Sequence, residues 1–466
     1  MSIFNSDLEP EVIALVLKDV ENEIYFIGIL GSGMYPLARM LAERGYRISG
    51  SDAKVDREYS EGGIAVKRQG STLNAGISAV VYSLAVAEDN PEILCARSRG
   101  IPLISRAQLL GALMSTYTTR IAVSGSHGKS TVTAMIDSIL FAAFVPHTSV
   151  SGAKLSCGEP YVDMGGEIFL AEACEYKDSF LRLSPTHQLI TSIELDHTDY
   201  FESLDQLRAS FLTAALRSDI AFINCDDPLA SEIAKEVRRN GVRICTYGRS
   251  DSANYRLTDI SHEGELTRFS VITPDGPIRL TTSLMGDFNL YNATAAVAVS
   301  DNLGIGKDGI RSGIADFRTV ERRMTLVTVI DGIPVYYDYA HHPSEIRAVI
   351  SAAKERYGTV TVVFRPHTYS RTKSLWNEFI SEFSKSDFTI MLDIYPAREE
   401  RIIGIDSVTL AKCIPGCVYA KMSEAAYLAL SRPTGAILLL GAGEIDVPLN
   451  DLTEIGKSTG YIPERR

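Results

Sequence analysis

Short apolar runs alternate with longer segments of helical periodicity along the N-terminal part of the chain. The runs Tyr25–Ile29, Arg47–Ser51 and Ala79–Ser83 predict strands, and the stretch Met34–Arg44 predicts a helix between the first two. This strand–helix–strand order is typical of a parallel sheet, which binds ligands at the carboxyl ends of its strands. We therefore expect a first α/β domain that ends in the polar stretch Ser115–Arg120.

The same alternation continues in the middle of the chain. A strand predicted at Ile121–Val123 leads through a glycine-rich loop into a helix with an apolar stripe. The predicted elements that follow are strands at Glu167–Ala171, Gln188–Ile193 and Ile220–Asn224, a hairpin within Tyr255–Thr282 and a helix at Asn289–Leu303.

A third α/β segment begins near Met324. A hairpin is expected at Thr325–Tyr337, around the turn pair Asp331-Gly332. Further strands are predicted at Thr359–Phe364, Phe388–Leu392 and Ala436–Leu440. With about 150 residues per domain as a prior, 466 residues fit three α/β domains in series.

Charge and composition exclude several classes of function. The chain has 46 Lys and Arg against 58 Asp and Glu, a net charge of -12, so we expect no nucleic-acid binding and any phosphate in a local pocket. No stretch approaches the ~20 apolar residues that span a bilayer, so we expect no membrane association. Seven scattered cysteines without zinc spacing are typical of a reduced, cytoplasmic protein.

The strongest chemical motif runs from Ser124 to Thr131, between a predicted strand and a predicted helix. Its glycines let backbone N–H groups turn toward a phosphate, and the helix N-terminus adds a favourable potential. Lys129 offers a cation for the β- and γ-phosphates of a nucleotide, and the Ser130 hydroxyl suits Mg²⁺. Val123 stands where the usual pattern has glycine. The alternative is a glycine-rich turn that carries a surface lysine.

Acidic residues follow two other strands predicted in this sheet. Glu172 ends one strand, and the segment Glu194–Asp199 follows another. Both are therefore expected at the edge of the sheet that carries the motif Ser124–Thr131, which we call the phosphate loop. A carboxylate there could hold Mg²⁺ against the phosphates. His197 lies in this segment, and its alternative role is that of a hydrogen-bonded loop histidine.

A second glycine cluster, Gly28–Gly33, precedes Asp52, which follows the next strand. The spacing resembles a dinucleotide-binding loop in permuted form, so it indicates a nucleotide or sugar diphosphate without specifying a nicotinamide. The alternative is a glycine turn that packs a helix on a strand.

Two polar clusters end strands of the third domain. Asp338–Pro343 follows one strand and Arg365–Arg371 another, so parallel strands would bring them to one edge. Arg371 could bind a carboxylate through two hydrogen bonds, and His341 or His367 could bind phosphate or substrate. Taken singly, each histidine is more often structural.

Together these motifs resemble those of the Mur ligases, over nearly the whole chain from about Ile24. The matching stretches are FIGILGSGM at Phe26, SGSD at Ser49, AEDNPEI at Ala87, GSHGKST at Gly125, AEACEYKDSFL at Ala171, IELDHTDYF at Ile193, GDFNLYNATAA at Gly286, ERR at Glu321, DYAHHPSEI at Asp338, RPHTYSRT at Arg365, DIYPAREERIIGIDS at Asp393 and GAGEI at Gly441.

The resemblance implies three domains: a Rossmann-like UDP-sugar domain at 1–117, a central P-loop-type ATPase at 118–323, and a C-terminal Rossmann-like domain at 324–466 that closes over ATP and the amino acid. The implied ATP site comprises Gly125, Ser126, His127, Gly128, Lys129, Ser130, Thr131, Asn289, Asn292, Arg323 and Asp338. The implied magnesium ligands are Ser130, Glu172 and His197. The implied UDP-sugar contacts are Gly31, Ser32, Gly33, Asp52, Ser83 and Arg106. His341, His367 and Arg371 would line the junction of acyl phosphate and amino acid, and Lys129, His197, His341 and Arg371 would be catalytic.

Three positions depart from the family pattern. Leu30 replaces a usual glycine, Ser71 stands where many relatives have histidine, and Thr368 replaces a common arginine. The first two concern UDP contacts and the third concerns recognition of the amino acid.

The stretches AEDNPEI and RPHTYSRT favour the branch of the family that joins L-alanine to the lactyl carboxylate of UDP-N-acetylmuramate. The expected reaction uses ATP and Mg²⁺, passes through an acyl phosphate, and serves peptidoglycan synthesis in the cytoplasm, in a monomer or homodimer. Three alternatives remain open at this point: a sister ligase that adds a recycled peptide or another amino acid, a nicotinamide-dependent oxidoreductase, and a non-catalytic nucleotide-binding protein.

Overall fold

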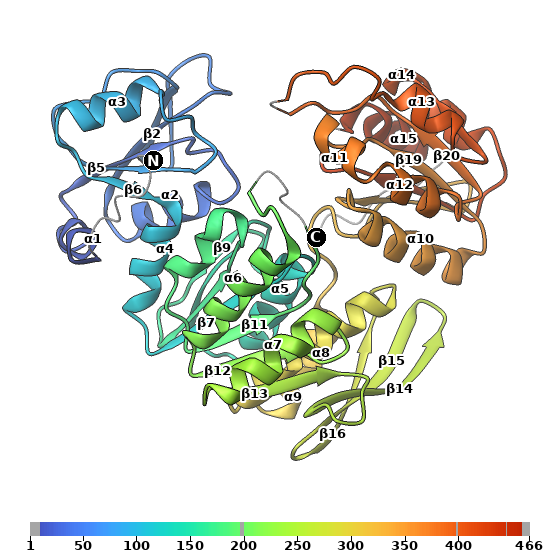
Figure 1. Cartoon of the computed structure of the whole chain (residues 1–466), viewed down its shortest axis with the longest axis horizontal. Helices are drawn as coiled ribbons and strands as arrows, with labels where there is room; N and C mark the ends of the chain where they lie inside the picture. Colours follow the sequence, from blue (N-terminus) through green and yellow to red (C-terminus); the bar gives the residue numbers. More distant parts are fainter. Residues whose placement is uncertain (1–9, 196–199, 398, 444, 459–466) are drawn as a thin grey trace. The chain divides into compact units, whose positions relative to one another are not determined.

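The computed structural model describes residues 10–195, 200–397, 399–443 and 445–458, which form two compact units. The first unit comprises residues up to 263 together with 268–282 and 291–317, and it contains two sheets. The second unit comprises residues 264–267, 283–290 and the chain from 318, and it contains the third sheet. The predicted α/β class with three sheet-containing domains is therefore confirmed (Figure 1). Within the described ranges, no helix has the length and apolar character that crossing a bilayer requires.

The first sheet has the strand order β3-β4-β2-β1-β5-β6, in which only β3 pairs in antiparallel fashion. Its strands are β1 Glu23–Ile27, β2 Arg47–Asp52, β3 Tyr59–Glu61, β4 Ile64–Arg68, β5 Ile77–Tyr82 and β6 Leu103–Ser105, and the helices of this part are α1 Pro10–Val16, α2 Tyr35–Glu43, α3 Pro91–Ser98 and α4 Arg106–Ser115.

Alternation along β1 builds a core on each face of this sheet. Ile24 and Phe26 belong to one hydrophobic cluster, whereas Tyr25 and Ile27 belong to another, because successive side chains of a strand point to opposite faces. Gly50 in β2 permits the close approach of β1, since an added Cβ would lie 2.5 Å from the carbonyl oxygen of Phe26. Strand β1 is paired with β2 on one side and β5 on the other, and the end of β2 accepts N–H groups of the loop that follows β1.

The second sheet has the order β16-β15-β14-β13-β12-β11-β7-β10-β8-β9. Its strands are β7 Thr119–Ser124, β8 His147–Val150, β9 Tyr161–Asp163, β10 Ile168–Glu172, β11 His187–Ile190, β12 Ile220–Asn224, β13 Arg243–Gly248, β14 Tyr255–Glu263, β15 Leu266–Thr273 and β16 Gly276–Thr282. The accompanying helices are α5 Lys129–Ala142, α6 Leu204–Leu216, α7 Pro228–Arg239, α8 Asp287–Asn302, α9 Lys307–Asp316 and the 3₁₀ segment η2 Tyr176–Arg182.

Helix α5, which follows the phosphate loop, is more deeply buried than its apolar stripe predicts. Every residue from Thr131 to Leu140 is buried, because both the sheet and α9 pack on the helix. At Gly313 of α9, an added Cβ would lie 2.4 Å from the Cα of Ile139, and the hydroxyl of Ser138 donates to the Gly313 carbonyl at 2.8 Å. Helix α5, from which the phosphate loop projects, is therefore a fixed part of the hydrophobic core.

A polar contact joins the parts of the first unit that carry its two sheets. Arg44, at the end of α2, donates from Nε and Nη2 to the two carboxylate oxygens of Asp163 in β9, at 2.7 and 3.0 Å. Nη2 also donates to the Tyr117 hydroxyl at 2.6 Å. Two-pronged pairing of this kind fixes orientation as well as distance.

The sheet of the second unit has the order β17-β18-β22-β19-β20-β21, with β17 antiparallel to β18 and the other pairings parallel. Its strands are β17 Thr325–Ile330, β18 Ile333–Asp338, β19 Val360–Phe364, β20 Phe388–Met391, β21 Cys417–Tyr419 and β22 Ala436–Leu440, and its helices are α10 Pro343–Tyr357, α11 Tyr369–Ser374, α12 Trp376–Phe383, α13 Ser407–Lys412, α14 Met422–Leu430 and α15 Asp446–Ser458.

The hairpin predicted around Asp331-Gly332 is confirmed. Both turn residues have positive φ, 49° and 82°, as a two-residue turn between twisted strands requires. The parallel strands β18, β19, β20 and β22 then end at one edge of the sheet, where the two polar clusters begin.

Candidate active site

The loop between β7 and α5 depends on two glycines with positive φ. Gly125 has φ 134°, and an added Cβ would lie 1.9 Å from the Thr191 hydroxyl oxygen. Gly128 has φ 84°, and an added Cβ would lie 2.6 Å from Oδ1 of Asn292. Only glycine fits both positions. The same contact puts the predicted residue Asn292 beside the loop.

Lys129 begins α5, and its ammonium group lies over the loop. It donates to the carbonyl oxygens of Gly125 and Ser126 and forms an ion pair of 3.0 Å with Glu175. Burial is the largest single influence and opposes the charged form, but Glu175 and the other negative neighbours, including Glu172, together raise the pKa of Lys129 above its ordinary value. Sequence reasoning missed Glu175, although an acid three residues after Glu172 was a usable signal.

The predicted magnesium ligands Ser130 and Glu172 lie together. The Ser130 hydroxyl is 3.0 Å from each carboxylate oxygen of Glu172, and Glu172 also accepts from Ser151 and from the backbone of Gly152, at 3.2 and 3.1 Å. A hydroxyl and a carboxylate are hard oxygen donors that suit Mg²⁺. The predicted third ligand, His197, lies outside the described residues.

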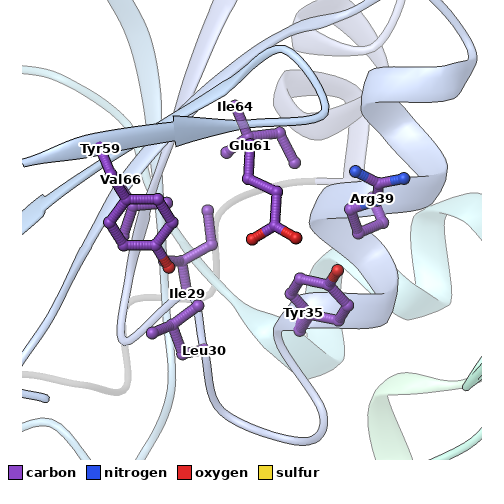
Figure 2. Close-up of a pocket in the computed structure, with 8 residues that line it drawn as sticks. All are labelled: Ile29, Leu30, Tyr35, Arg39, Tyr59, Glu61, Ile64 and Val66. Carbon is purple, nitrogen blue, oxygen red and sulfur yellow. The ribbon is translucent and has the colours of Figure 1, made fainter. Parts of the chain in front are cut away.

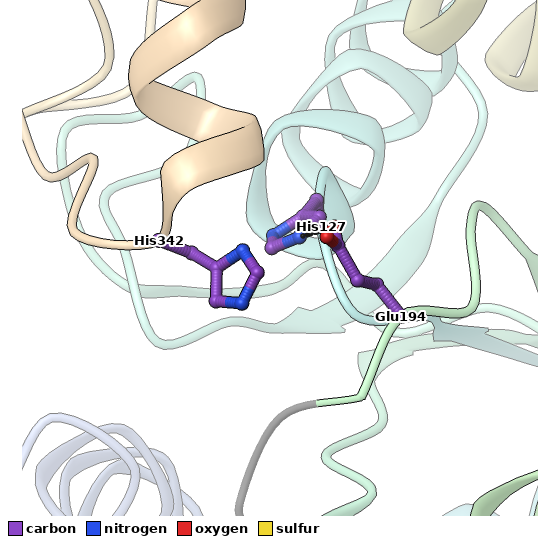
Figure 3. A group of neighbouring side chains, drawn as sticks. All are labelled: His127, Glu194 and His342. Carbon is purple, nitrogen blue, oxygen red and sulfur yellow. Dashed lines mark hydrogen bonds and ion pairs between the residues drawn. The ribbon is translucent and has the colours of Figure 1, made fainter. Parts of the chain in front are cut away.

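His127 of the phosphate loop is tied to the segment after β11. Its Nε2 donates to the Glu194 carboxylate at 2.9 Å, and the two side chains point toward one another in Figure 3. The Ser126 hydroxyl bonds the backbone of Glu194 at 2.8 Å, both as donor and as acceptor. The figure also draws His342, which starts α10 in the second unit. Loop and segment therefore hold each other by side chains and backbone.

The predicted nucleotide contact Asn289 is buried in the second unit. Its Nδ2 donates to the carbonyl oxygen of Met285 at 2.8 Å. Helix α8 begins in the second unit and continues in the first, which contains Asn292.

In the second unit, Asp338 ends β18 and shapes the loop that follows. Its two carboxylate oxygens accept the backbone N–H groups of Met324 and Ala340, both at 2.7 Å. Burial raises the pKa of Asp338 to about 6, against the opposing charge of Arg323. Arg323 lies 3.6 Å from Glu345, with its guanidinium over a tyrosine ring. Sequence reasoning did not single out Glu345.

The structure brings the predicted residues His341, His367 and Arg371 together. The rings of His341 and His367 have centroids 5.9 Å apart, and Arg371 Nη1 donates to His367 Nδ1 at 3.1 Å. His341 Nδ1 lies 3.0 Å from the carbonyl oxygen of Tyr339, which can only accept, so Nδ1 carries the hydrogen. In the neutral ring, Nε2 of His341 therefore bears the lone pair of a base.

Tyr395 completes this edge, and sequence reasoning missed it. The rings of Tyr395 and His367 are stacked with their centroids 5.7 Å apart, and the guanidinium of Arg365 lies over the Tyr395 ring, 4.8 Å from its centroid. The signal was available, because Tyr395 follows β20 and so belongs to the same edge of the parallel sheet. Thr368 donates its N–H to the Tyr395 carbonyl at 2.8 Å and has φ 64°, a strained value for a β-branched residue.

In the N-terminal part, the first glycine loop rests on the end of β2. The Asp52 carboxylate is buried and accepts the N–H groups of Leu30 and Lys54, both at 3.0 Å. At Gly33, an added Cβ would lie 3.1 Å from the Arg106 side chain, so these two predicted residues are neighbours. Ser83 accepts the N–H of Ala85 at 3.3 Å. Gly31 and Ser32 lie within the same loop.

A pocket opens beside this loop, lined by Ile29 and Leu30, by Tyr35 and Arg39 of α2, and by the β3–β4 hairpin (Figure 2). Its walls are mostly apolar and aromatic, with a guanidinium from α2 and a carboxylate from Glu61. We did not predict the hairpin, so sequence reasoning missed the pocket. Pockets of this composition suit a small organic group with a few polar atoms.

Three family profiles match successive parts of the chain. They are described as "Mur ligase family, catalytic domain" over residues 23–118, "Mur ligase middle domain" over 123–300 and "Mur ligase, glutamate ligase domain" over 322–443.

Curated relatives are similar over nearly the full length. A UDP-N-acetylmuramate--L-alanine ligase of Lachnospira eligens is 37% identical over 443 residues, covering 91% of this chain and 96% of the relative. The ligase of the same name from Aquifex aeolicus is 35% identical and covers 92% and 97%. Among solved structures, a UDP-N-acetylmuramate-alanine ligase of Thermotoga maritima has a TM-score of 0.76 at 24% identity, covering 94% of this chain and 99% of that one. A MurF ligase of Thermotoga maritima in complex with ADP has a TM-score of 0.59 at 18% identity, covering 82% and 89%.

Proposed function

The chain belongs to the Mur ligase family, and from this premise we propose that it joins L-alanine to the lactyl carboxylate of UDP-N-acetylmuramate, while ATP is cleaved to ADP and phosphate. The observation that carries the proposal is the similarity, at 33–37% identity across most of the chain, to relatives that bear the name of this ligase. It is an amide-forming ligase of peptidoglycan synthesis, and we place its reaction in the cytoplasm, where ATP is available.

We assign residues 1–117 to the UDP-sugar, 118–323 to ATP and 324–466 to the amino acid and the later step. The phosphate loop supports the second assignment, since backbone N–H groups at a helix N-terminus and a buried cation suit a triphosphate. The edge with His341, His367 and Arg371 supports the third, because a guanidinium can pair with the carboxylate of an amino acid.

The first step activates a carboxylate, which is a poor electrophile. An oxygen of the lactyl carboxylate attacks the γ-phosphorus of ATP, the bond to the bridging oxygen breaks, and ADP leaves with the electron pair. Lys129 would stabilise the negative charge on the equatorial oxygens. Its ion pair with Glu175 keeps the ammonium charged and fixed in place.

Ser130 and Glu172 would hold Mg²⁺, with His197 as a further ligand by motif match. When bound, this ion offsets charge on the phosphate oxygens. The 3.0 Å between the Ser130 hydroxyl and the Glu172 carboxylate supports this assignment.

In the second step, the amine of alanine attacks the acyl carbon and the C–O bond to phosphate breaks, so that an amide forms and phosphate leaves. The amine must lose a proton, and Nε2 of His341 would accept it as a general base. Arg371 would orient the amino acid, and the Asp338 carboxylate would hold the loop that carries His341.

The test is ADP release by purified protein with magnesium-ATP, UDP-N-acetylmuramate and one amino compound at a time. We expect L-alanine to support turnover well above glycine, serine, glutamate and a tripeptide. A murein peptide ligase from Psychrobacter arcticus has a TM-score of 0.65 with this chain, so the peptide is the rival worth including. Turnover with the peptide instead of alanine would replace the proposed substrate, and no ADP with any compound would refute the ligase.

A further inference from the structure

Glu399 lies in the segment that follows β20, and the catalytic steps above give it no role. Its carboxylate accepts the backbone N–H of Ser370 through Oε2 at 2.8 Å and the Ser370 hydroxyl through Oε1. Ser370 stands in the first turn of α11, where backbone N–H groups have no acceptor within the helix. Burial is the largest single influence on the pKa of Glu399 and raises it, but the hydrogen bonds that the carboxylate accepts together lower that pKa below its ordinary value. The acceptor is therefore an ionised carboxylate at neutral pH.

The segment that carries Glu399 is also joined by its backbone to the segment after β19. Tyr395 donates its N–H to the carbonyl oxygen of Pro366 and accepts the N–H of Thr368, both at 2.8 Å, which adds one parallel bridge beyond the ends of β19 and β20. The chain then turns, since the N–H of Glu399 donates to the carbonyl oxygen of Pro396 at 2.9 Å. This turn brings the Glu399 carboxylate back to α11.

The two attachments stand on either side of the residues that we assign to the amino acid. The backbone bonds of Tyr395 flank His367, and the Glu399 carboxylate bonds the residue directly before Arg371. Arg371 Nη1 donates to His367 Nδ1 at 3.1 Å. The direction of this guanidinium therefore depends on a backbone that Tyr395 holds at one end and Glu399 at the other.

Backbone strain shows that this part of the chain needs such attachments. Thr368 has φ 64° and Ala397 has φ 52°, both in the left-handed region, which costs a residue with a side chain roughly 1–2 kcal/mol. Strain of this kind persists only where the surroundings hold it. The hydroxyl of Thr368 accepts the N–H of Arg371 at a long 3.4 Å, whereas Glu399 accepts the N–H of Ser370 at 2.8 Å. Of these two bonds at the start of α11, the shorter and charged one comes from Glu399.

We propose that Glu399 is a positioning residue for the amino-acid substrate, whose carboxylate holds the first turn of α11 so that the guanidinium of Arg371 can pair with the carboxylate of that substrate. The proposal rests on the proposed function, because it takes the edge with His341, His367 and Arg371 as the place of the amino acid. Two-pronged pairing requires the guanidinium plane to face the carboxylate. A guanidinium that is held before binding loses less conformational entropy on binding, so a loosened α11 should weaken binding of the amino acid alone.

The test compares Glu399→Ala with Glu400→Ala in the ADP-release assay. Glu399→Ala removes both acceptors of Ser370, whereas Glu400→Ala removes the same charge from an exposed neighbour. We expect Glu399→Ala to raise the KM for L-alanine about tenfold, because binding then has to order the start of α11. The KM for ATP and the KM for UDP-N-acetylmuramate should stay unchanged. Glu400→Ala should leave all three KM values at those of the wild type.

Ser370→Ala gives a milder second variant at an exposed position. It removes the hydroxyl that bonds Glu399 but keeps the backbone N–H, so we expect the KM for L-alanine to rise less, by about threefold. Added to Glu399→Ala, it should cause no further rise, because its partner is already absent. If Glu399→Ala does not fold, Ser370→Ala alone decides, and an unchanged KM for L-alanine would count against the proposal.

A purely structural role predicts a different pattern. Equal rises in the three KM values would overturn the proposal, and so would the same rise in Glu400→Ala as in Glu399→Ala. A wild type that releases no ADP with L-alanine would defeat the proposed function itself. A wild type that turns L-alanine over with the same KM as Glu399→Ala would defeat only this inference.

Discussion

The phosphate loop of the first unit and the polar edge of the second unit, which carries His341, His367, Arg371 and Tyr395, both follow the carboxyl ends of parallel strands. They are built differently. The phosphate loop takes its unusual backbone angles at glycines, Gly125 and Gly128. The polar edge takes positive φ at residues with side chains, namely Arg322, Met324 and Thr368. One loop is shaped by residues that tolerate the conformation, and the other is held against local strain by its surroundings.

The difference indicates which groups would bind a ligand at each site. In the phosphate loop, backbone N–H groups and one cation would contact the ligand, so the side chains can be few and small. At the polar edge, rings and guanidinium groups contact one another, from Arg323 through His341 and His367 to Tyr395. We expect substitutions to act through charge and backbone in the first case and through side-chain placement in the second.

The largest effect should come from Lys129→Ala, which removes the cation of the phosphate loop. We expect kcat for ADP release to fall by about 10³, the scale of losing a charge-stabilising group in a water-excluded site. The control is Lys235→Ala, an exposed lysine of α7 in the same unit, which should leave kcat unchanged. Near-normal ADP release by Lys129→Ala would remove the loop from the reaction.

Gly125→Ala should be the next most damaging change. A methyl group would collide with the Thr191 hydroxyl at 1.9 Å, and φ 134° is strained for alanine, so we expect a loss of about 3 kcal/mol in the free energy of unfolding. The KM for ATP should rise at least tenfold. Gly241→Ala is the matched control, because Gly241 has φ 83° in open space and should cost only about 1 kcal/mol, with no change in KM. Similar losses in both variants would mean that strain alone is at work.

Asp338 should make the second unit sensitive to pH. Its pKa is about 6 in the folded protein and about 3.9 in an unfolded chain, so the folded state binds the proton more tightly. Its contribution to stability is therefore present below about pH 4 and is lost as the pH rises through 6, a change of about 3 kcal/mol. Relative to Asp338→Asn, the wild type should lose stability between pH 4 and 7 in urea unfolding. The control is Asp331→Asn, at an exposed turn residue. If the difference in the free energy of unfolding between the wild type and Asp338→Asn did not change with pH, the raised pKa of Asp338 would be contradicted.

Thr368 offers the smallest and sharpest test of strain. Thr368→Ala removes the hydroxyl that caps α11 at Arg371 but keeps the strained φ, whereas Thr368→Gly removes both the cap and the strain. Where the backbone angles suit both residues, the glycine variant is less stable than the alanine variant by about 0.4–1 kcal/mol. Here we expect the reverse, with the glycine variant more stable by about 1 kcal/mol in thermal unfolding. The usual order would show that the polar edge carries no strain at this position.

The same contrast explains how far the sequence could predict the molecule. Many strands were found because parallel strands buried on both faces leave continuous apolar runs, as at Ile220–Asn224, which is β12 to the residue. The parallel strands β4, β6, β8, β13 and β21 were not predicted. The phosphate loop was found because its glycine-rich motif, between a predicted strand and a predicted helix, is recognisable in the sequence. The β3–β4 hairpin is short and exposed in β3, so it left no apolar signal.

Some site residues are recognised in full only through partners that lie far away in the sequence. Glu175, three residues after Glu172, is a buried acid whose role depends on its ion pair with Lys129. Strain at Thr368 is likewise invisible, because nothing in the residue type announces it. The magnesium ligand His197 and the residue roles stay predictions.

The deep burial of α5 has a consequence for the lifetime of the phosphate loop. Since no residue from Thr131 to Leu140 faces solvent, exchange of its amide hydrogens requires opening of the surrounding core rather than fraying of a surface helix. Helix α5, which begins with Lys129, should therefore stay helical as long as the unit remains folded. Thermal inactivation should begin with the unfolding of another part of the chain.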